Sequence, residues 1–174
     1  MDFITKLSLS NSFDSILVLV DRFSKMAVLI PTISSIASLD LANLFIKNVF
    51  SKNGLPSRIV SYRGFLFVYL FWTNLCQKLN IPGDLSTYYN QEANGQTERV
   101  NKILEHYLCM YVSYHQDDWN TWLRLPEFAY NSSDHSSTKK SPCFIFNERD
   151  PQFDSVQITK DTPAGSLSTK IQSV

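Results

Sequence analysis

Short apolar runs near the start of the chain predict β-strands. Residues 15–20 (Ser-Ile-Leu-Val-Leu-Val) form a continuous β-branched and leucine run, which is typical of a strand buried on both faces. A short polar connection leads to residues 26–30 (Met-Ala-Val-Leu-Ile), which we expect to end at Pro31 and to pair with the first run as an antiparallel hairpin. Residues 2–5 form a third candidate strand. It is shorter than the usual five to six residues, so we expect a first strand that is truncated at the N-terminus.

Helical and strand patterns alternate after the hairpin. We expect a helix that is capped by Ser38 and stopped by Gly54, because glycine tolerates the left-handed conformation that ends a helix. A second helix is predicted over residues 70–79, with strands over residues 58–61 and 84–87. An antiparallel start followed by alternating strands and helices indicates an α/β fold with a mixed sheet flanked by helices.

The strongest periodicity predicts a helix over residues 96–114. Its apolar residues recur at i, i+3, i+4 and i+7, and this stripe leaves Glu98, Lys102 and Glu105 on the opposite face. A cap at Asp117 or Asp118 predicts a further helix.

We expect both tryptophans of that further helix, Trp119 and Trp122, to be core residues, and Pro126 to end or kink it. A serine-rich loop is predicted over residues 131–142. Hydrophobic content falls after about residue 150, so we predict one domain over residues 1–150 and a linker or tail over residues 151–174.

Composition excludes several classes of protein. The 174 residues are 44% hydrophobic and 13% aromatic, which is enough core material to exclude general disorder. No apolar run approaches the roughly 20 residues of a membrane-spanning helix, and no targeting signal is visible, so an intracellular protein is expected. The formal net charge of zero gives no electrostatic hint of nucleic-acid binding. Three cysteines without metal-ligand spacing argue against zinc, and we expect Cys76 and Cys109 to be small core residues.

Carboxylates are the clearest candidates for catalytic residues. Enzymes that move phosphodiester bonds hold two divalent cations with oxygen ligands, so a strand-borne Asp2 and a helix-borne Glu98 could form part of such a site. Two carboxylates this far apart in the chain are weak evidence of a metal site on their own. The alternative to a metal-ligand role is that Glu98 stabilises the N-terminus of its helix and that Asp2 is solvated. The three histidines have no partner at ligand spacing and are expected to be surface or core residues.

Several stretches closely resemble the integrase of Gypsy-class LTR retrotransposons, in particular the chromodomain-bearing group of vertebrate genomes. The most specific stretch is Asn94-Gly-Gln-Thr-Glu-Arg-Val-Asn101. The others are residues 14–26, 54–56, 71–72 and 135–138. The resemblance implies an RNase H-like fold with a mixed five-stranded sheet. It also implies polynucleotidyl transfer dependent on Mg²⁺ or Mn²⁺, with element ends and target DNA as partners, a homo-oligomer, and a nuclear location.

The resemblance also assigns roles to individual residues. Asp2 matches the first of the three acidic metal ligands of the family, and Glu98 matches the third. The second acidic position, separated from Glu98 by 35 intervening residues, is Tyr62. Gln96 and Asn101 match positions beside the catalytic glutamate and are expected to contact substrate DNA.

Two functions follow from this assignment. The chain is either a fragment of an integrase catalytic core that is inactive because Tyr62 replaces an aspartate, or a non-catalytic interaction or DNA-binding module used by the host. An error in the sequence at position 62 is a third explanation of the tyrosine.

Overall fold

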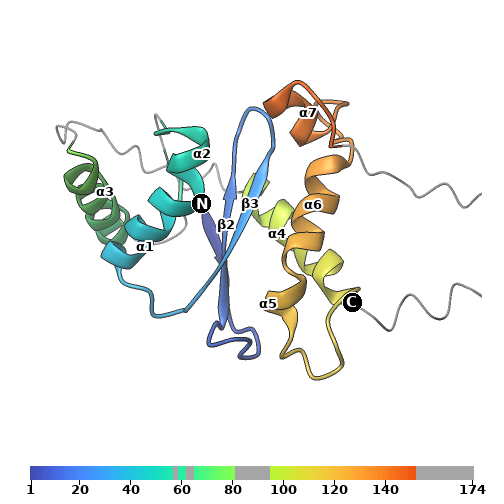
Figure 1. Ribbon diagram of the computed structural model, residues 1–174, viewed down its shortest axis with the longest axis horizontal. Coiled ribbons are helices and arrows are strands. Elements are labelled where there is room, and N and C mark those ends of the chain that lie inside the picture. Colours follow the sequence, from blue (N-terminus) through green and yellow to red (C-terminus); the bar gives the residue numbers. More distant parts are fainter. Residues whose placement is uncertain (57–58, 62–64, 81–94, 152–174) are drawn as a thin grey trace, which may run out of the picture.

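A three-layer arrangement of helices and strands organises the chain. The computed structural model describes residues 1–56, 59–61, 65–80 and 95–151. The strands are β1 (Asp2–Ile4), β2 (Ser15–Val20) and β3 (Ala27–Thr32). The helices are α1 (Ser38–Phe45), the π-helical turn η1 (Ile46–Phe50), α2 (Ser51–Asn53), α3 (Phe65–Leu79), α4 (Gly95–Cys109), α5 (Trp119–Trp122), α6 (Arg124–Ser132) and α7 (Pro142–Asn147). Figure 1 shows α1, α2 and α3 on one side of the strands and α4, α5 and α6 on the other.

The central strand β2 pairs with β1 on one side and with β3 on the other, both antiparallel. Successive side chains of a strand point to opposite faces, so Leu17 enters the core on the α1 and α3 side while Ile16 and Val18 enter the core on the α4 side. All three are almost completely buried. The prediction of a strand buried on both faces is confirmed.

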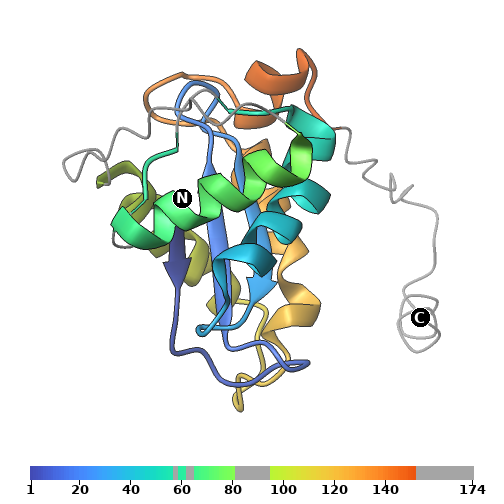
Figure 2. The same cartoon turned by 90° about the vertical axis from the view of Figure 1, so that its left-hand side faces the viewer.

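Aromatic rings dominate the core on the α1 and α3 side. Phe45 of α1 meets Phe71 of α3 edge to face, with ring centroids 5.6 Å apart, and Phe71 meets Trp72 at 5.9 Å. Figure 2, seen from this side, shows α3 and α1 covering the strands. Fully burying one such side chain stabilises a fold by about 1.5–3 kcal/mol, so this layer holds α3 firmly against the sheet.

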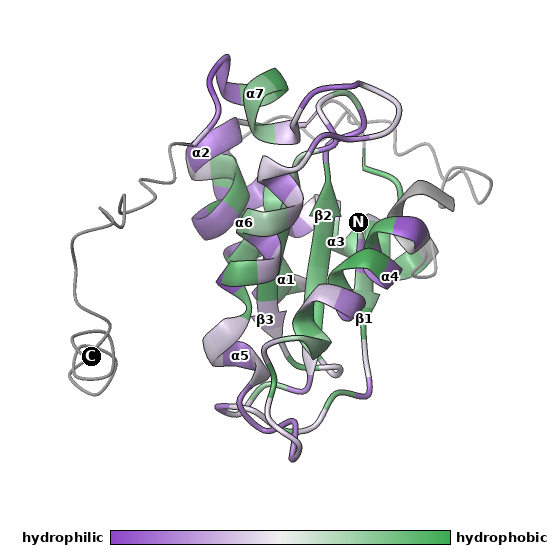
Figure 3. Cartoon of the chain, turned by 90° about the vertical axis from the view of Figure 1, so that its right-hand side faces the viewer, coloured by the Kyte–Doolittle hydropathy of each residue, from purple (hydrophilic) through white to green (hydrophobic). Residues whose placement is uncertain are grey.

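The opposite core joins α4 and α5 to the sheet. Val100 and Leu104 of α4 pack with Trp119 against the face of β2 that carries Ile16 and Val18. Hydrophobic residues concentrate on the strands and on parts of the surrounding helices in Figure 3. Among the described helices, none combines the length and apolar character that a membrane crossing needs.

The ends of α4 and α3 differ from the prediction. Helix α4 ends at Cys109, five residues before the predicted end, where the amides of Met110 and Tyr111 bond to carbonyls three residues back and tighten the chain into a turn. Cys109 is exposed, so its expected place in the core is wrong, whereas Cys76 is buried as expected. Helix α3 begins at Phe65, five residues before its predicted start.

The expected cap at Ser38 is wrong, whereas Asp118 occupies its predicted N-cap position without a side-chain cap bond. Ala37 occupies the N-cap position of α1, and the Ser38 hydroxyl accepts a hydrogen bond from the Asn74 side chain of α3 (3.1 Å). Asp118 is the N-cap residue of α5, but its carboxylate accepts from the Ser113 amide and from the Trp122 indole (3.0 Å each) and makes no cap bond. A long-range partner on α3 has replaced the cap at Ser38, whereas the partners of Asp118 are close to it in the chain.

The structure separates α5 from α6 and places Pro126 and the two tryptophans on these helices. Helix α5 ends at Trp122, and Pro126 is the third residue of α6, where a helix has no need of the missing N–H group. Trp119 is buried at 2% exposure, as predicted, whereas Trp122 is 39% exposed and is not a core residue.

The loop predicted over residues 131–142 contains more structure than expected. Helix α6 continues to Ser132, and α7 begins at Pro142 after an N-cap at Ser141, whose hydroxyl accepts from the Phe144 amide (3.0 Å). Serine followed by proline at the first helical position is a recognised start signal that identifies this short helix.

The five-stranded sheet is not confirmed by the part of the chain that is described, which contains three strands. Strand β3 extends through Pro31, which pairs with Ile16. Residues 59–61 are not assigned to a strand, but the Met1 amino group donates to the Val60 carbonyl (2.7 Å), so this segment lies beside the start of β1. The predicted strand over residues 84–87 lies outside the described residues.

Polar side chains of α6 bind the free edge of β3. The Asn131 amide accepts from the Ala27 N–H (2.9 Å) and donates to the Ala27 carbonyl (2.8 Å). One helical turn earlier, Glu127 accepts from the Leu29 N–H (3.3 Å) and Arg124 donates to the Leu29 carbonyl (3.2 Å). These bonds satisfy backbone groups that would otherwise be available to another strand.

Replacing Asn131 tests whether its side chain stabilises the edge of β3. Asn131→Ala would leave the fully buried Ala27 N–H and carbonyl unpaired, so we expect the free energy of unfolding to fall by about 2–4 kcal/mol. Urea denaturation measures the change. Asn43→Ala, at an exposed position of α1, is the matched control and should change stability by less than about 0.5 kcal/mol. Equal stability of Asn131→Ala and the unmodified chain would contradict the role of this side chain.

Candidate functional site

Asp2 connects the first strand to the long helix α4. It lies at the start of β1, opposite Val18 of β2, and is half-buried. One carboxylate oxygen accepts from the Phe3 amide (2.8 Å), and the other accepts from the side-chain amide of Asn101 (2.9 Å). Two residues that the sequence singled out, 99 positions apart, are therefore in direct contact.

Asn101 has a second polar atom at this contact. Its Nδ2 group donates to Asp2, which sets the orientation of the amide, and its Oδ1 atom is buried with no hydrogen-bond partner among the described residues. A buried acceptor without a donor costs free energy in the folded state. The site thus retains one unused acceptor beside the Asp2 carboxylate.

The other residues singled out by the sequence are placed only in part. Glu98 and Gln96 belong to α4, whose backbone is described at both positions, whereas their side chains lie outside the description. Glu98 precedes Asn101 by three residues on α4. Tyr62 lies outside the described residues and directly follows Ser61, which is buried.

Oxygen ligands from several carboxylates would be needed to hold Mg²⁺ or Mn²⁺ here. Among the described residues, no group of three or more His, Cys, Asp or Glu side chains is arranged to hold a metal ion. At this site the described side chains offer the single carboxylate of Asp2, and each of its oxygens already accepts a hydrogen bond.

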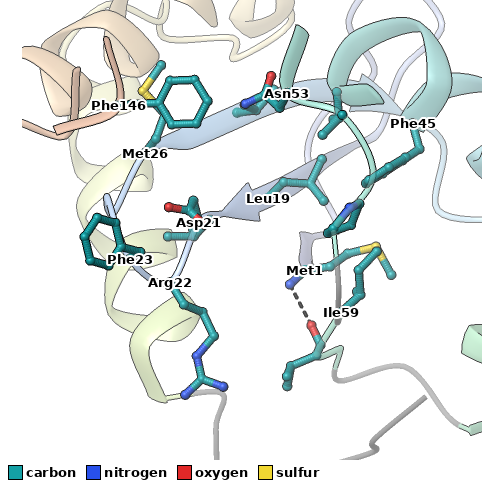
Figure 4. Close-up of a pocket in the computed structure, with 16 residues that line it drawn as sticks. Met1, Leu19, Asp21, Arg22, Phe23, Met26, Phe45, Asn53, Ile59 and Phe146 are labelled. Carbon is teal, nitrogen blue, oxygen red and sulfur yellow. Dashed lines mark hydrogen bonds between the residues drawn. The ribbon is translucent and has the colours of Figure 1, made fainter. Parts of the chain in front are cut away.

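A separate pocket of about 410 Å³ opens beside the turn between β2 and β3. Figure 4 shows apolar side chains from the strands and from the α1–α2 segment around it, with Arg22 at its edge. The carboxylate of Asp21 is engaged in the turn, because it accepts from both the amide and the hydroxyl of Ser24 (2.7 Å each). Asp2 is not one of the residues that line this pocket, so the pocket and the Asp2–Asn101 contact are distinct features.

Two basic side chains, those of Lys25 and Arg99, act electrostatically on His135. We call Lys25, Arg99 and His135 the cationic cluster. Partial burial lowers the pKa of the His135 imidazole, and the positive charges of Lys25 and Arg99 lower it further. Beside it, burial raises the pKa of Tyr130 to about 12, so that phenol stays neutral.

The sequence did not single out this cluster, because its members are up to 110 positions apart. A signal was nevertheless present. Each of the three residues falls within a stretch that carried the family resemblance, namely residues 14–26, 94–101 and 135–138.

The chain is similar in sequence to known transposon proteins. The chain is 33% identical over 158 residues to the Transposon Tf2-3 polyprotein of Schizosaccharomyces pombe, a match that covers 91% of the chain and 12% of the polyprotein. The chain thus spans about an eighth of the length of the curated relatives it matches. No protein-family model matches it.

Solved structures show the same fold. The HTLV-2 integrase catalytic core domain in complex with magnesium superposes with a TM-score of 0.58 at 17% identity, over 81% of this chain and 90% of that one. An intasome of simian T-cell lymphotropic virus in complex with the PP2A regulatory subunit B56 gamma gives a TM-score of 0.64 at 19% identity, over 91% of this chain and 59% of that one. The chain is therefore homologous to part of a transposon polyprotein, and its fold is the RNase H-like fold of the integrase catalytic core.

Proposed function

We propose that the chain is part of a retrotransposon integrase catalytic core that binds DNA and does not catalyse integration. The observation that carries this proposal is the hydrogen bond between Asp2 of β1 and Asn101 of α4. It joins the strand of the first acidic position to the helix of the third, Glu98, as an integrase centre requires. The second acidic position is Tyr62.

The chemistry of Tyr62 is the reason for proposing inactivity. Its phenol is neutral near pH 7, because the reference pKa of tyrosine is about 10, and it offers one oxygen where an aspartate would offer two. Asp2 and Glu98 would remain as metal ligands. Binding of Mg²⁺ or Mn²⁺ is then weakened or lost, and with it the stabilisation of the entering and leaving oxygens that two cations supply.

The finer assignment belongs to the same proposal. We assign the chain to the Gypsy-class LTR group with a chromodomain, with residues 1–150 as the core and residues 151–174 as a linker or tail. A five-stranded sheet is supported by the Met1–Val60 hydrogen bond, which brings residues 59–61 alongside β1. Gln96 and Asn101 would contact DNA.

Assembly and location follow from the same assignment. A homo-oligomer acting on element ends and target DNA in the nucleus is expected, since the HTLV-2 core is described in both dimeric and trimeric forms.

A non-catalytic interaction module of the host is the second candidate function. Its supporting observation is the outer side of α3, where Leu66, Tyr69 and Leu70 are 68%, 51% and 42% exposed. Neighbouring apolar residues at helical spacing on a surface suit a protein partner. This function would need no metal, so a tyrosine at position 62 would be tolerated.

Restoring the carboxylate at position 62 tests the proposed inactivity. We expect no strand transfer with Mn²⁺ or Mg²⁺ from the chain joined to the flanking segments of a homologous integrase. Tyr62→Asp in the same context should raise activity at least about 100-fold, because one metal clamp is worth several kcal/mol and each ~1.4 kcal/mol is tenfold in rate. The assay follows joining of a labelled duplex end to plasmid DNA.

Two further variants complete the test of position 62. Tyr114→Asp adds the same carboxylate at a position that is 96% exposed, and it should stay inactive. Metal-dependent activity in the chain with Tyr62, abolished by Glu98→Gln, would contradict the proposal.

A further inference from the structure

The pocket beside the turn between β2 and β3 is built by parts of the chain that lie far apart in the sequence. Leu19 of β2 and Val28 of β3 line it from the sheet, Val49 lines it from η1, and Phe146 lines it from α7. Its volume of about 410 Å³ falls within the range of roughly 300–1,000 Å³ that is usual for small-molecule sites. The pocket is therefore large enough to hold a ligand.

The wall contributed by η1 has an unusual backbone. Residues Ile46–Phe50 form a π-helical turn between α1 and α2, and Val49 of this turn and Asn53 of α2 both line the pocket. Turns of this kind interrupt α-helices and occur frequently at functional sites. The turn favours a binding role for this wall independently of the volume of the pocket.

The two sides of the pocket differ in their exposure to solvent. Figure 4 shows Phe45 and Ile59 on one side and Phe23 and Arg22 on the other. Phe45 is 1% exposed and Ile59 is 8% exposed, whereas Phe23 is 81% exposed and Arg22 lies on the surface. A polar group loses free energy when it is buried without a partner, so a ligand would place its apolar part beside Phe45 and Ile59 and a polar end near Arg22.

Arg22 is the charged group that this polar end would meet. Among the described residues the one ion pair joins Arg124 to Glu127, so the Arg22 guanidinium forms none with a described carboxylate. The neighbouring Asp21 carboxylate is held in the turn by the amide and the hydroxyl of Ser24 (2.7 Å each). A guanidinium pairs with a carboxylate through two parallel hydrogen bonds, so Arg22 favours a ligand that carries a carboxylate.

The amino group of Met1 is a second basic group that lines the pocket, but it does not compete with Arg22 for an anion. It donates to the Val60 carbonyl (2.7 Å), and burial lowers its pKa to about 6. Near pH 7 this group is therefore mostly uncharged, and the positive charge at the pocket belongs to Arg22.

We propose that this pocket binds an apolar molecule that carries one carboxylate, with its apolar part against Leu19, Phe45 and Ile59 and its carboxylate on Arg22. Removal of apolar surface from water supplies most of the affinity. The contact with Arg22 selects the anion over a neutral molecule of the same shape. The site goes beyond the proposed function and does not depend on it, because Asp2 does not line the pocket.

Methyl NMR of the three methionines in the whole chain tests the site with octanoate as the probe. Met1 and Met26 line the pocket, whereas Met110 directly follows α4, is 60% exposed and does not line it. Octanoate should shift the methyl signals of Met1 and Met26 saturably and leave that of Met110 as the internal reference. Lengthening the probe from hexanoate to octanoate should tighten binding by up to about fourfold for each methylene that becomes buried. Shifts that do not saturate, or equal shifts of all three signals, would overturn the site.

Comparison of octanoate with octanol tests the role of Arg22. Arg22→Gln should weaken octanoate binding at least about threefold and change octanol binding by less than about twofold, because octanol carries no charge for the guanidinium to attract. Arg99→Gln is the matched control, since it removes the same charge from an exposed position of α4 that does not line the pocket, and it should leave octanoate binding within about twofold. Equal affinity of the unmodified chain and Arg22→Gln for octanoate would overturn the proposal.

Filling the pocket from η1 provides a second variant. Val49 is half-buried, and Val49→Phe should weaken octanoate binding at least about fivefold, because the ring occupies space that the methylenes of the ligand would fill. Circular dichroism of each variant shows whether it is folded, and the Arg22 comparison remains the test if Val49→Phe does not fold. Unchanged octanoate affinity in folded Val49→Phe would contradict the proposal.

Discussion

Burial of β2 on both faces is the constraint on which the rest of the structure depends. Ile16, Leu17 and Val18 follow one another along the strand, and none is more than 1% exposed. Because their side chains alternate, each face of the sheet needs its own cover. The helices before residue 80 supply one layer and those after residue 94 supply the other.

The same constraint positions the polar groups that matter for function. Val100 and Leu104 must face the sheet to complete the second core, and this turns the intervening Asn101 toward β1, where it meets Asp2. Tyr130 joins the same core and supports His135 at the surface. The Asp2–Asn101 contact and the cationic cluster are thus two consequences of how α4 and α6 pack.

Features encoded within a few residues could be predicted from the sequence, and features that depend on distant partners could not. The apolar run of β2, the stop at Gly54 with its positive φ, and the central part of α4 follow from local pattern and were predicted. The capping role of Ser38 was wrong because its hydroxyl bonds to Asn74 of the distant helix α3. Asp118 is the N-cap residue of α5 as predicted, but its carboxylate bonds to Ser113 and Trp122 and makes no cap bond.

The candidate site divides in the same way. Asp2 and Asn101 were singled out by family resemblance, and the structure supplies their contact; neither periodicity nor spacing indicates it. Lys25, Arg99 and His135 could not be grouped in advance, because no local rule connects a turn, a helix and a loop that follow one another at such distances in the chain.

We propose that this chain has kept the fold of an integrase core and has lost the metal site. Paramagnetic broadening by Mn²⁺ tests this directly, with the Asn101 side-chain amide, which donates to Asp2, as the reporter in NMR spectra. We expect no saturable broadening of this signal at millimolar Mn²⁺ in the chain with Tyr62, and saturable broadening in Tyr62→Asp. Saturable broadening in the chain with Tyr62 that disappears in Glu98→Gln would contradict it.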